Sequence, residues 1–158
     1  GVNQLGRLSK TPGLAYEQAN VAPNSILPVK EIGYNYRVSF DIDGTKEAMG
    51  TELFRSQDAV FYLSDPISGM LGFARDGYLN TFTYNVQPGQ RMNIAIEGDN
   101  KATRLFINGK QVEELNIQER WMDKEGKSRM RNVRTLVFPL EKAGNFQSKI
   151  TNLKVEQK

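Results

Sequence analysis

The sequence predicts an all-β fold of one domain, arranged as an antiparallel sandwich or jelly roll. Apolar and polar residues alternate with a period of two in several segments, most clearly over residues 34–42. Turn-forming pairs such as Asp-Gly and Asn-Gly separate consecutive apolar runs. A helical pattern is weak, and at most one helical turn is expected, within residues 113–122. Eight or more short strands with turn signals about every 8–12 residues are typical of such sandwiches.

The N-terminal part is expected to hold three strands. Residues 13–17 form the first, whereas residues 26–27 lie between two prolines and belong to an edge or a loop, because proline cannot donate to a strand ladder. Residues 34–42 form the next strand, since Tyr, Val, Phe and Ile alternate there with Asn, Arg, Ser and Asp. Residues 61–63 form a third strand, which stops at an Asp-Pro turn.

The middle of the chain predicts consecutive hairpins. Residues 71–74 and 78–84 flank an Asp-Gly pair, which is a strong hairpin signal. Residues 92–96 and 103–107 are strands joined by a Gly-Asp-Asn turn. An Asn-Gly pair then leads into residues 111–112, because a type I′ turn needs positive φ at both central positions.

The last strands are expected at residues 133–138 and across residues 146–155, and they complete one domain over residues 1–158. No internal repeat or low-complexity tract divides the chain. Because the chain begins with Gly rather than Met, it is expected to be a processed product or a piece of a longer multidomain protein.

The composition excludes several classes of function. The 158 residues include 21 basic and 18 acidic ones, and a net charge of +3 is too small to indicate a nucleic-acid partner. The chain has no cysteine and no histidine, which excludes disulfides, thiolate or imidazole metal sites, and catalytic triads that use either residue. No apolar run approaches the roughly 18 residues of a membrane span.

Two stretches resemble the laminin-G-like members of the concanavalin A-like jelly-roll superfamily. The first is GQRMNIAIEGDNKATRLFINGKQV, which ends at Val112, and the second is the closing strand NFQSKITNLKVEQK. Ser148 stands where that family usually has glycine. YNYRVSFDID also matches as an early core strand, TELFRSQDAVFYL as a hairpin and LGFARDGYLNTFTYNV as the next one. The resemblance covers about residues 30–158 and implies a jelly-roll sandwich of two antiparallel sheets, a fold that hosts many functions.

A narrower similarity points to a parent protein. KTPGLAYEQANVAPNSILPVKEIGYNYRVSFDIDG and TLVFPLEKAGNFQSKITNLKV are similar to the C-terminal module of multidomain family 20 glycoside hydrolases, the β-N-acetylhexosaminidases secreted by gut Gram-negative anaerobes. This similarity implies a non-catalytic accessory module that binds carbohydrate, with the active site upstream of this chain. The implied partners are an N-acetylhexosamine-containing glycan and the parent's catalytic domain. The implied location is secreted, periplasmic or at the surface of a bacterium.

Two other functions stay open at this point. The chain is expected not to be an enzyme by itself, but a structural, interdomain or protein-interaction module without a ligand is the main alternative. A glucanase-like enzyme is less favoured: Asp41 and Asp43 lie on one face of a strand, yet the related glucanases resemble E-x-D-x-x-E, and this chain reads FDIDGTKE.

The candidate carbohydrate-binding residues are aromatic and polar side chains outside the clearest core strands. Sugar sites combine an aromatic platform with amides and charged groups that bind hydroxyls. The candidates are Trp121, in a polar segment interpreted as a loop, and a cluster of Arg75, Asp76, Tyr78, Asn80 and Tyr84. Packing is the competing interpretation of each aromatic residue, because aromatic side chains pack far more often than they bind ligands.

Acidic and basic side chains of the chain suggest two further kinds of site, for a metal ion and for a polyanion. Asp41, Asp43, Asp99 and Asn100 supply oxygen atoms of the kind that calcium prefers, so a structural calcium ion remains an alternative to the expectation of no cofactor. Gly-Asp-Asn forms a turn equally well without a metal. Basic residues over 124–134 are diluted by acidic ones and are interpreted as a solvated loop.

Overall fold

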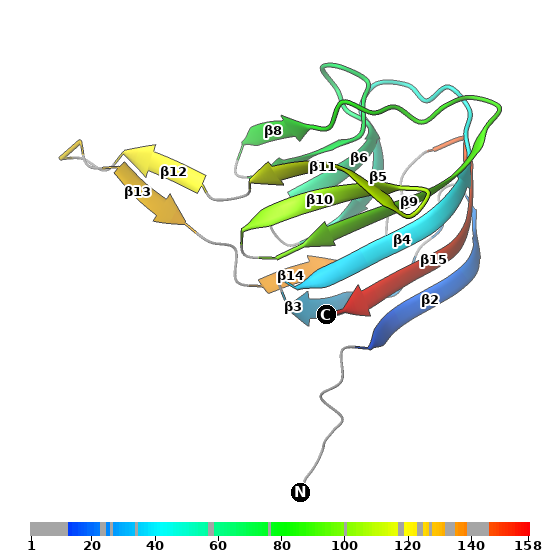
Figure 1. Ribbon diagram of the computed structural model, residues 1–158, viewed down its shortest axis with the longest axis horizontal. Coiled ribbons are helices and arrows are strands. Elements are labelled where there is room, and N and C mark those ends of the chain that lie inside the picture. The colour runs from blue at the N-terminus through cyan, green and yellow to red at the C-terminus, as the bar shows by residue number, and fades with distance from the viewer. Residues whose placement is uncertain are drawn as a thin grey trace, which may run out of the picture.

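The computed structural model describes most of the chain as strands connected by turns and loops (Figure 1). The described residues are 13–22, 25, 27–33, 35–56, 59–75, 77–99, 101–116, 119–122, 125–126, 128–131, 135–138 and 146–158. Within these ranges there is no helix, and hence none that is long and apolar enough to cross a membrane. The predicted all-β class is confirmed.

The larger sheet has six strands in the order β11-β10-β9-β4-β15-β2, and all neighbours are antiparallel. Its members are β2 (Leu14–Val21), β4 (Tyr36–Asp43), β9 (Arg91–Gly98), β10 (Ala102–Ile107), β11 (Lys110–Asn116) and β15 (Lys149–Gln157). The C-terminal strand β15 lies between β2 and β4 (Figure 1). The first and last strands of the described chain, β2 and β15, therefore pair with each other in one sheet.

The second layer is a four-stranded antiparallel sheet in the order β5-β6-β7-β8. Its strands are β5 (Thr51–Arg55), β6 (Ala59–Ser64), β7 (Gly72–Arg75) and β8 (Tyr78–Thr81). A pair formed by β3 (Lys30–Gly33) and β14 (Thr135–Phe138) lies beside β5, where the rings of Phe138 and Phe54 are 4.9 Å apart. A further hairpin, β12 (Glu119–Met122) with β13 (Ser128–Arg131), projects from the sandwich (Figure 1).

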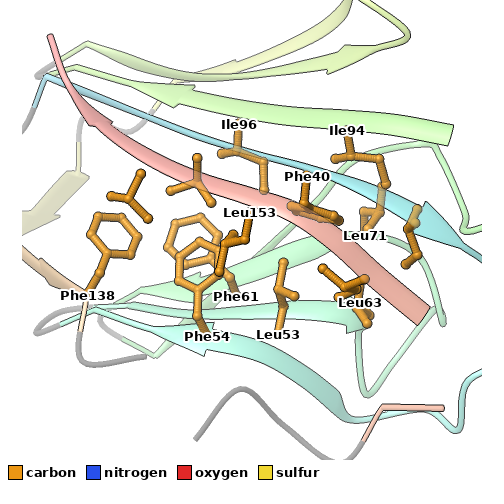
Figure 2. Close-up of a cluster of buried hydrophobic side chains, with 14 of the residues drawn as sticks. Phe40, Leu53, Phe54, Phe61, Leu63, Leu71, Ile94, Ile96, Phe138 and Leu153 are labelled. Atoms are coloured by element: carbon orange, nitrogen blue, oxygen red, sulfur yellow. The ribbon is translucent and has the colours of Figure 1, made fainter. Parts of the chain in front are cut away.

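The core lies between the two layers because every second side chain points inward. On β4, Tyr36, Val38, Phe40 and Ile42 are buried while the residues between them are partly exposed. Phenylalanines from β5, β6 and β14 form an aromatic cluster opposite them, as Figure 2 shows for Phe54, Phe61 and Phe138. Each such side chain contributes roughly 1.5–3 kcal/mol when removed from water, so this core supplies the main driving force for folding.

The predicted tight turns are present. Asn108 and Gly109 have φ angles of 51° and 83° and join β10 to β11, as a type I′ turn requires. Gly77, with φ of 81°, lies in the turn between β7 and β8. Gly98 serves a different purpose: a Cβ atom there would collide with the ring of Tyr36, so glycine allows the ring to lie on the sheet.

Several element predictions need correction. The helical turn expected within residues 113–122 is wrong, because the described residues of that range lie on β11 and β12. The turn at Asn108 returns the chain along β10, and the ladder hydrogen bonds formed there override a weak local helical pattern. Strand β3 was not predicted, β8 ends at Thr81 rather than Tyr84, and β2 extends to Val21. Part of the basic segment interpreted as a loop belongs to β13.

Candidate functional site

The predicted cluster around the β7–β8 hairpin is brought together in part. Tyr78 and Arg75 are directly paired across the hairpin, but their side chains lie at different depths. Tyr78 is 67% exposed, whereas Arg75 is 3% exposed and its guanidinium lies 5.2 Å from the centre of the Phe73 ring. Tyr78 is thus available to a ligand, and Arg75 packs inside the sandwich.

The remaining predicted residues are spread over different parts of the molecule. Asn80 lies on β8 with its amide 3.4 Å from the carbonyl oxygen of Tyr78, and Tyr84 packs partly against the core. Asp76 lies outside the described residues. Trp121 is on β12, paired with Arg129 of β13, and this two-stranded sheet is separate from the sheet that holds β8. The loop interpretation of Trp121 is therefore wrong, because its segment pairs as a strand.

The outer side of the four-stranded sheet presents a continuous surface, which we call the sheet face. Cross-strand neighbours on a sheet share one side, so the register places these residues in two rows. One row is Arg55, Val60, Ala74 and Leu79, and the other is Glu52, Tyr62, Gly72 and Thr81. The intervening residues on β6, Phe61 and Leu63, are buried in the core, which shows that the two rows face outward.

An aromatic ring and an ion pair lie side by side on the sheet face. Arg55 donates from Nε and Nη2 to the two carboxylate oxygens of Glu52, each at 2.7 Å. Hydrogen bonding to Glu52, followed by the charge of Glu52, raises the pKa of Arg55, so the guanidinium stays protonated. Arg55 is 52% exposed and Glu52 25% exposed, and both retain hydrogen-bonding capacity toward solvent. Tyr62, directly paired with Glu52, is partly exposed beside them.

Strand β7 contributes only small residues to the middle of the sheet face. Its outward residues are Gly72, which has no side chain, and Ala74, which has a methyl group. The neighbouring outward residues are larger: Val60 and Tyr62 on β6, and Leu79 on β8. Gly72 is buried, and a Cβ atom there would lie 2.7 Å from the backbone oxygen of Asn80, so β8 covers this position. The partly exposed residue of β7 on the sheet face is therefore Ala74.

A pocket of about 410 Å³, which we call the end pocket, lies at one end of the sandwich. It is formed by the connections between β4 and β5, β6 and β7, and β8 and β9, together with the end of β6. The lining residues are Thr45, Lys46, Glu47, Met49, Leu63, Ser64, Ser68, Gly69, Asn85, Val86 and Pro88. Its volume is within the range of about 300–1,000 Å³ that is usual for small-ligand pockets.

A buried carboxylate holds one wall of the end pocket. Asp65 is fully buried and accepts hydrogen bonds from the amides of Ile67 (2.8 Å) and Ser68 (2.6 Å), and from the hydroxyls of Ser68 and Thr81. Burial raises the pKa of Asp65, but these four hydrogen bonds outweigh it, and the pKa is lowered from its ordinary value. The loop of residues 65–70 is thereby fixed around a charged group.

Carboxylates on the six-stranded sheet are engaged by protein donors. Asp41 accepts hydrogen bonds from the side-chain amides of Asn152 (2.9 Å) and Asn93 (3.0 Å), which lower its pKa, as does the charge of Arg91. Arg91 also pairs with Asp43 at 3.0 Å. Within the described residues, no group of three or more acidic side chains is placed to hold a metal ion.

Asp99 acts in the turn between β9 and β10. Its Oδ1 atom accepts hydrogen bonds from the amides of Lys101 (2.7 Å) and Ala102 (2.9 Å), and Oδ2 pairs with Arg104 at 3.0 Å. Burial raises its pKa, but these interactions lower it by more. The aspartate therefore has a complete structural role in the turn, as the turn interpretation of Gly-Asp-Asn expects. Asn100 lies outside the described residues.

Tyr62, Arg55 and Glu52 were not predicted as site residues from the sequence. The alternation over residues 59–64 places Tyr62 on one side of the strand and Phe61 and Leu63 on the other, which indicates that one of the two sides faces solvent. The sequence does not indicate which side of the strand is buried, because that depends on where the six-stranded sheet packs. The pairing of Glu52 with Arg55 was equally hidden, since a bulge in β5 changes the register there.

Comparisons with solved structures support the fold. Domain 4 of AbnA, an extracellular GH43 arabinanase from Geobacillus stearothermophilus solved in complex with arabinotriose, has a TM-score of 0.52 and 15% identity over 85% of this chain. This chain spans 64% of that chain's length. The galectin LEC-6 of Caenorhabditis elegans has a TM-score of 0.54 and 10% identity, covering 88% of this chain and 94% of the galectin.

These likenesses concern the fold, because both identities are below 25%. No protein-family model matches the sequence, and no curated protein matches it. The predicted jelly-roll sandwich of two antiparallel sheets is confirmed.

Proposed function

We propose that this chain is a non-catalytic carbohydrate-binding module whose glycan lies across the sheet face. The observation that carries the proposal is the placement of Tyr62 beside the paired side chains of Arg55 and Glu52 on the sheet face. An aromatic ring packs against the apolar face of a sugar ring, and a guanidinium and a carboxylate bind its hydroxyl groups. The likeness to an arabinanase domain in complex with arabinotriose and to a galectin supports a sugar ligand for this fold.

The proposal assigns binding and not hydrolysis to this chain. Glycoside hydrolysis by the common mechanisms uses two carboxyl groups that flank the scissile bond. In the described part of the sheet face, Glu52 is the single carboxylate, and Arg55 holds both of its oxygens. On the other sheet, Asp41 and Asp43 are hydrogen-bonded to neighbouring side chains. This arrangement favours recognition of a sugar over chemistry on it.

The narrower part of the proposal concerns the parent protein. Similarity of both ends of the sequence to the C-terminal module of family 20 glycoside hydrolases supports an accessory role beside a β-N-acetylhexosaminidase, in a secreted, periplasmic or surface-exposed bacterial protein. The glycan proposed on this basis contains N-acetylhexosamine, and the second partner is the parent's catalytic domain. The module then keeps the enzyme close to its polymeric substrate.

A glycan array with the purified chain tests the proposal. Tyr62→Ala is measured alongside Tyr78→Ala and Trp121→Ala, because the three variants report on the sheet face, the β8 edge and the β12–β13 hairpin. We expect binding that is lost in Tyr62→Ala and retained in the other two. Loss in Tyr78→Ala or Trp121→Ala alone would move the site to that element. Silence across the array would contradict the proposal and favour an interdomain or structural module.

A further inference from the structure

The end pocket has two walls of different chemistry and is separate from the sheet-face rows. Met49, Val86 and Pro88 provide apolar surface, and Met49 is 65% exposed. Lys46 and Asn85, both exposed, provide an ammonium group and a carboxamide. A ligand that fills the pocket must therefore offer an apolar group and a hydrogen-bond acceptor close to one another.

Other polar groups of the end pocket are already occupied. The carboxylate of Glu47 accepts hydrogen bonds from the amides of Gln147 (3.0 Å) and Ser148 (2.7 Å), and the hydroxyl of Ser68 donates to Asp65. In contrast, no described carboxylate pairs with Lys46, and no described group bonds to the carboxamide of Asn85. The hydroxyls of Ser64 and Thr45 contact the Gly69 carbonyl and the Ser148 hydroxyl, so Lys46 and Asn85 are the side-chain donors of the described lining that remain open to a ligand.

We propose that the end pocket binds a short acyl group carried by a glycan, namely an acetyl group attached to a sugar through nitrogen or oxygen. The carbonyl oxygen accepts a hydrogen bond from Lys46 or Asn85, and the methyl group packs against Met49 and Val86. The pocket is larger than an acetyl group, so part of the sugar ring enters with it. This inference rests on the proposed function, because it assumes a glycan ligand.

The two walls together favour an acyl group over simpler alternatives. A sugar without acyl substituents presents hydroxyls in most directions and leaves Met49, Val86 and Pro88 in contact with water. A free anion is attracted by Lys46 but meets the carboxylate of Glu47 in the same pocket. An acyl carbonyl is a neutral acceptor with a methyl group beside it, which satisfies both walls.

The experiment compares two trisaccharides that share a β1,4-linked glucose backbone. Chitotriose carries acetamido groups and cellotriose carries hydroxyls in their place. Isothermal titration calorimetry with each sugar uses the wild-type chain, Lys46→Met, which removes the donor but keeps the stem, and Asn85→Trp, which fills the pocket. Lys154→Met is the matched control, since Lys154 is an exposed lysine on the six-stranded sheet. Acetylated and deacetylated xylo-oligosaccharides form the arm that tests an O-linked acetyl group.

We expect the wild-type chain to bind chitotriose about tenfold more tightly than cellotriose, which corresponds to about 1.4 kcal/mol. Asn85→Trp should remove this preference and Lys46→Met should reduce it, both with unchanged binding of cellotriose, while Lys154→Met keeps the preference. A preference in the xylan arm instead identifies an O-acetyl ligand and supports the inference as well. Equal binding of acylated and unacylated sugars by the wild type, or a preference that survives undiminished in both Lys46→Met and Asn85→Trp, overturns the inference alone. Absence of binding to every sugar overturns the proposed function together with it.

Discussion

The two outer faces of the sandwich use their polar side chains in different ways. Across the six-stranded sheet, five strands contribute a row of alternating charges: Glu114, Arg104, Glu97, Arg37 and Glu156. Ion pairs link Arg104 to Glu114 (2.9 Å) and Arg37 to both Glu97 and Glu156. The sheet face on the other layer has a single described ion pair, Arg55 with Glu52, beside partly exposed apolar residues.

This contrast is consistent with a structural role for the six-stranded sheet and the proposed binding role for the sheet face. Charged groups that bind one another stabilise the sheet they lie on but offer few donors to a ligand. When a ligand covers partly exposed aromatic and aliphatic side chains, the removal of apolar surface from water favours binding. Under the proposed function, the polar groups of the six-stranded sheet pair with one another, and the ligand binds on the sheet face.

Loss of the most buried carboxylate should have the largest effect. Asp65→Ala leaves two amides and two hydroxyls without their acceptor, and we expect the free energy of unfolding to fall by about 3 kcal/mol. Asp41→Ala, at a partly exposed carboxylate with a 24% exposed side chain, should cost about 1 kcal/mol. Urea denaturation of both variants measures the difference. Equal losses would show that burial does not distinguish the two carboxylates.

Aromatic residues on the two faces should differ in their effect on binding. Tyr62→Ala should lower the affinity for the strongest glycan on the array at least about tenfold, or about 1.4 kcal/mol. Phe106→Ala is the matched control, because Phe106 lies on the outer side of the six-stranded sheet. The guanidinium of Arg37 lies over the Phe106 ring, 5.0 Å from the ring centre. Titration calorimetry should show that the Phe106→Ala variant binds the glycan with wild-type affinity. An equal loss in both variants would contradict the assignment of one binding face.

Arginines on the two faces should show the reverse behaviour. Arg37→Gln removes ion pairs to two carboxylates and the contact with Phe106, and we expect a loss of about 1 kcal/mol in unfolding free energy. Arg55→Gln removes one exposed pair and should change stability by less than about 0.5 kcal/mol, but it should weaken glycan binding. Thermal unfolding and calorimetry measure the two effects. A larger stability loss for Arg55→Gln would reverse the comparison.

The smallest effect is on the pH dependence of stability. Asp41, Asp65 and Asp99 have pKa values below their ordinary one, so their stabilisation is fully present above the unfolded pKa of about 3.9 and is lost as the pH falls through the folded pKa. The melting temperature should therefore decline below about pH 4. Asp65→Asn should show a shallower decline, because one of the three groups no longer titrates. An unchanged slope would show that Asp65 contributes nothing to acid sensitivity.

Much of the fold followed from the sequence, because its signals are local. The alternation on β4 and the Asn108–Gly109 turn each have a cause within a few residues, and both were predicted and are present. The weak helical pattern of residues 113–122 failed for the opposite reason: pairing with β10 and β13 decides their conformation. Of the candidate site, Tyr78 lies exposed as a binding residue must, whereas the burial of Arg75 depends on how the layers pack.

By itself, the sequence determined the all-β class, the main turns and the exclusion of cysteine and histidine chemistry. These follow from residue type and spacing, which do not depend on distant contacts. The tertiary structure decided that Tyr62 faces outward beside Glu52 and Arg55, and that loops from residues 45–49, 64–69 and 85–88 meet in one pocket. The physical reason is that strand pairing and layer packing join residues far apart in the chain, and a period of two does not say which of its two sides meets the core.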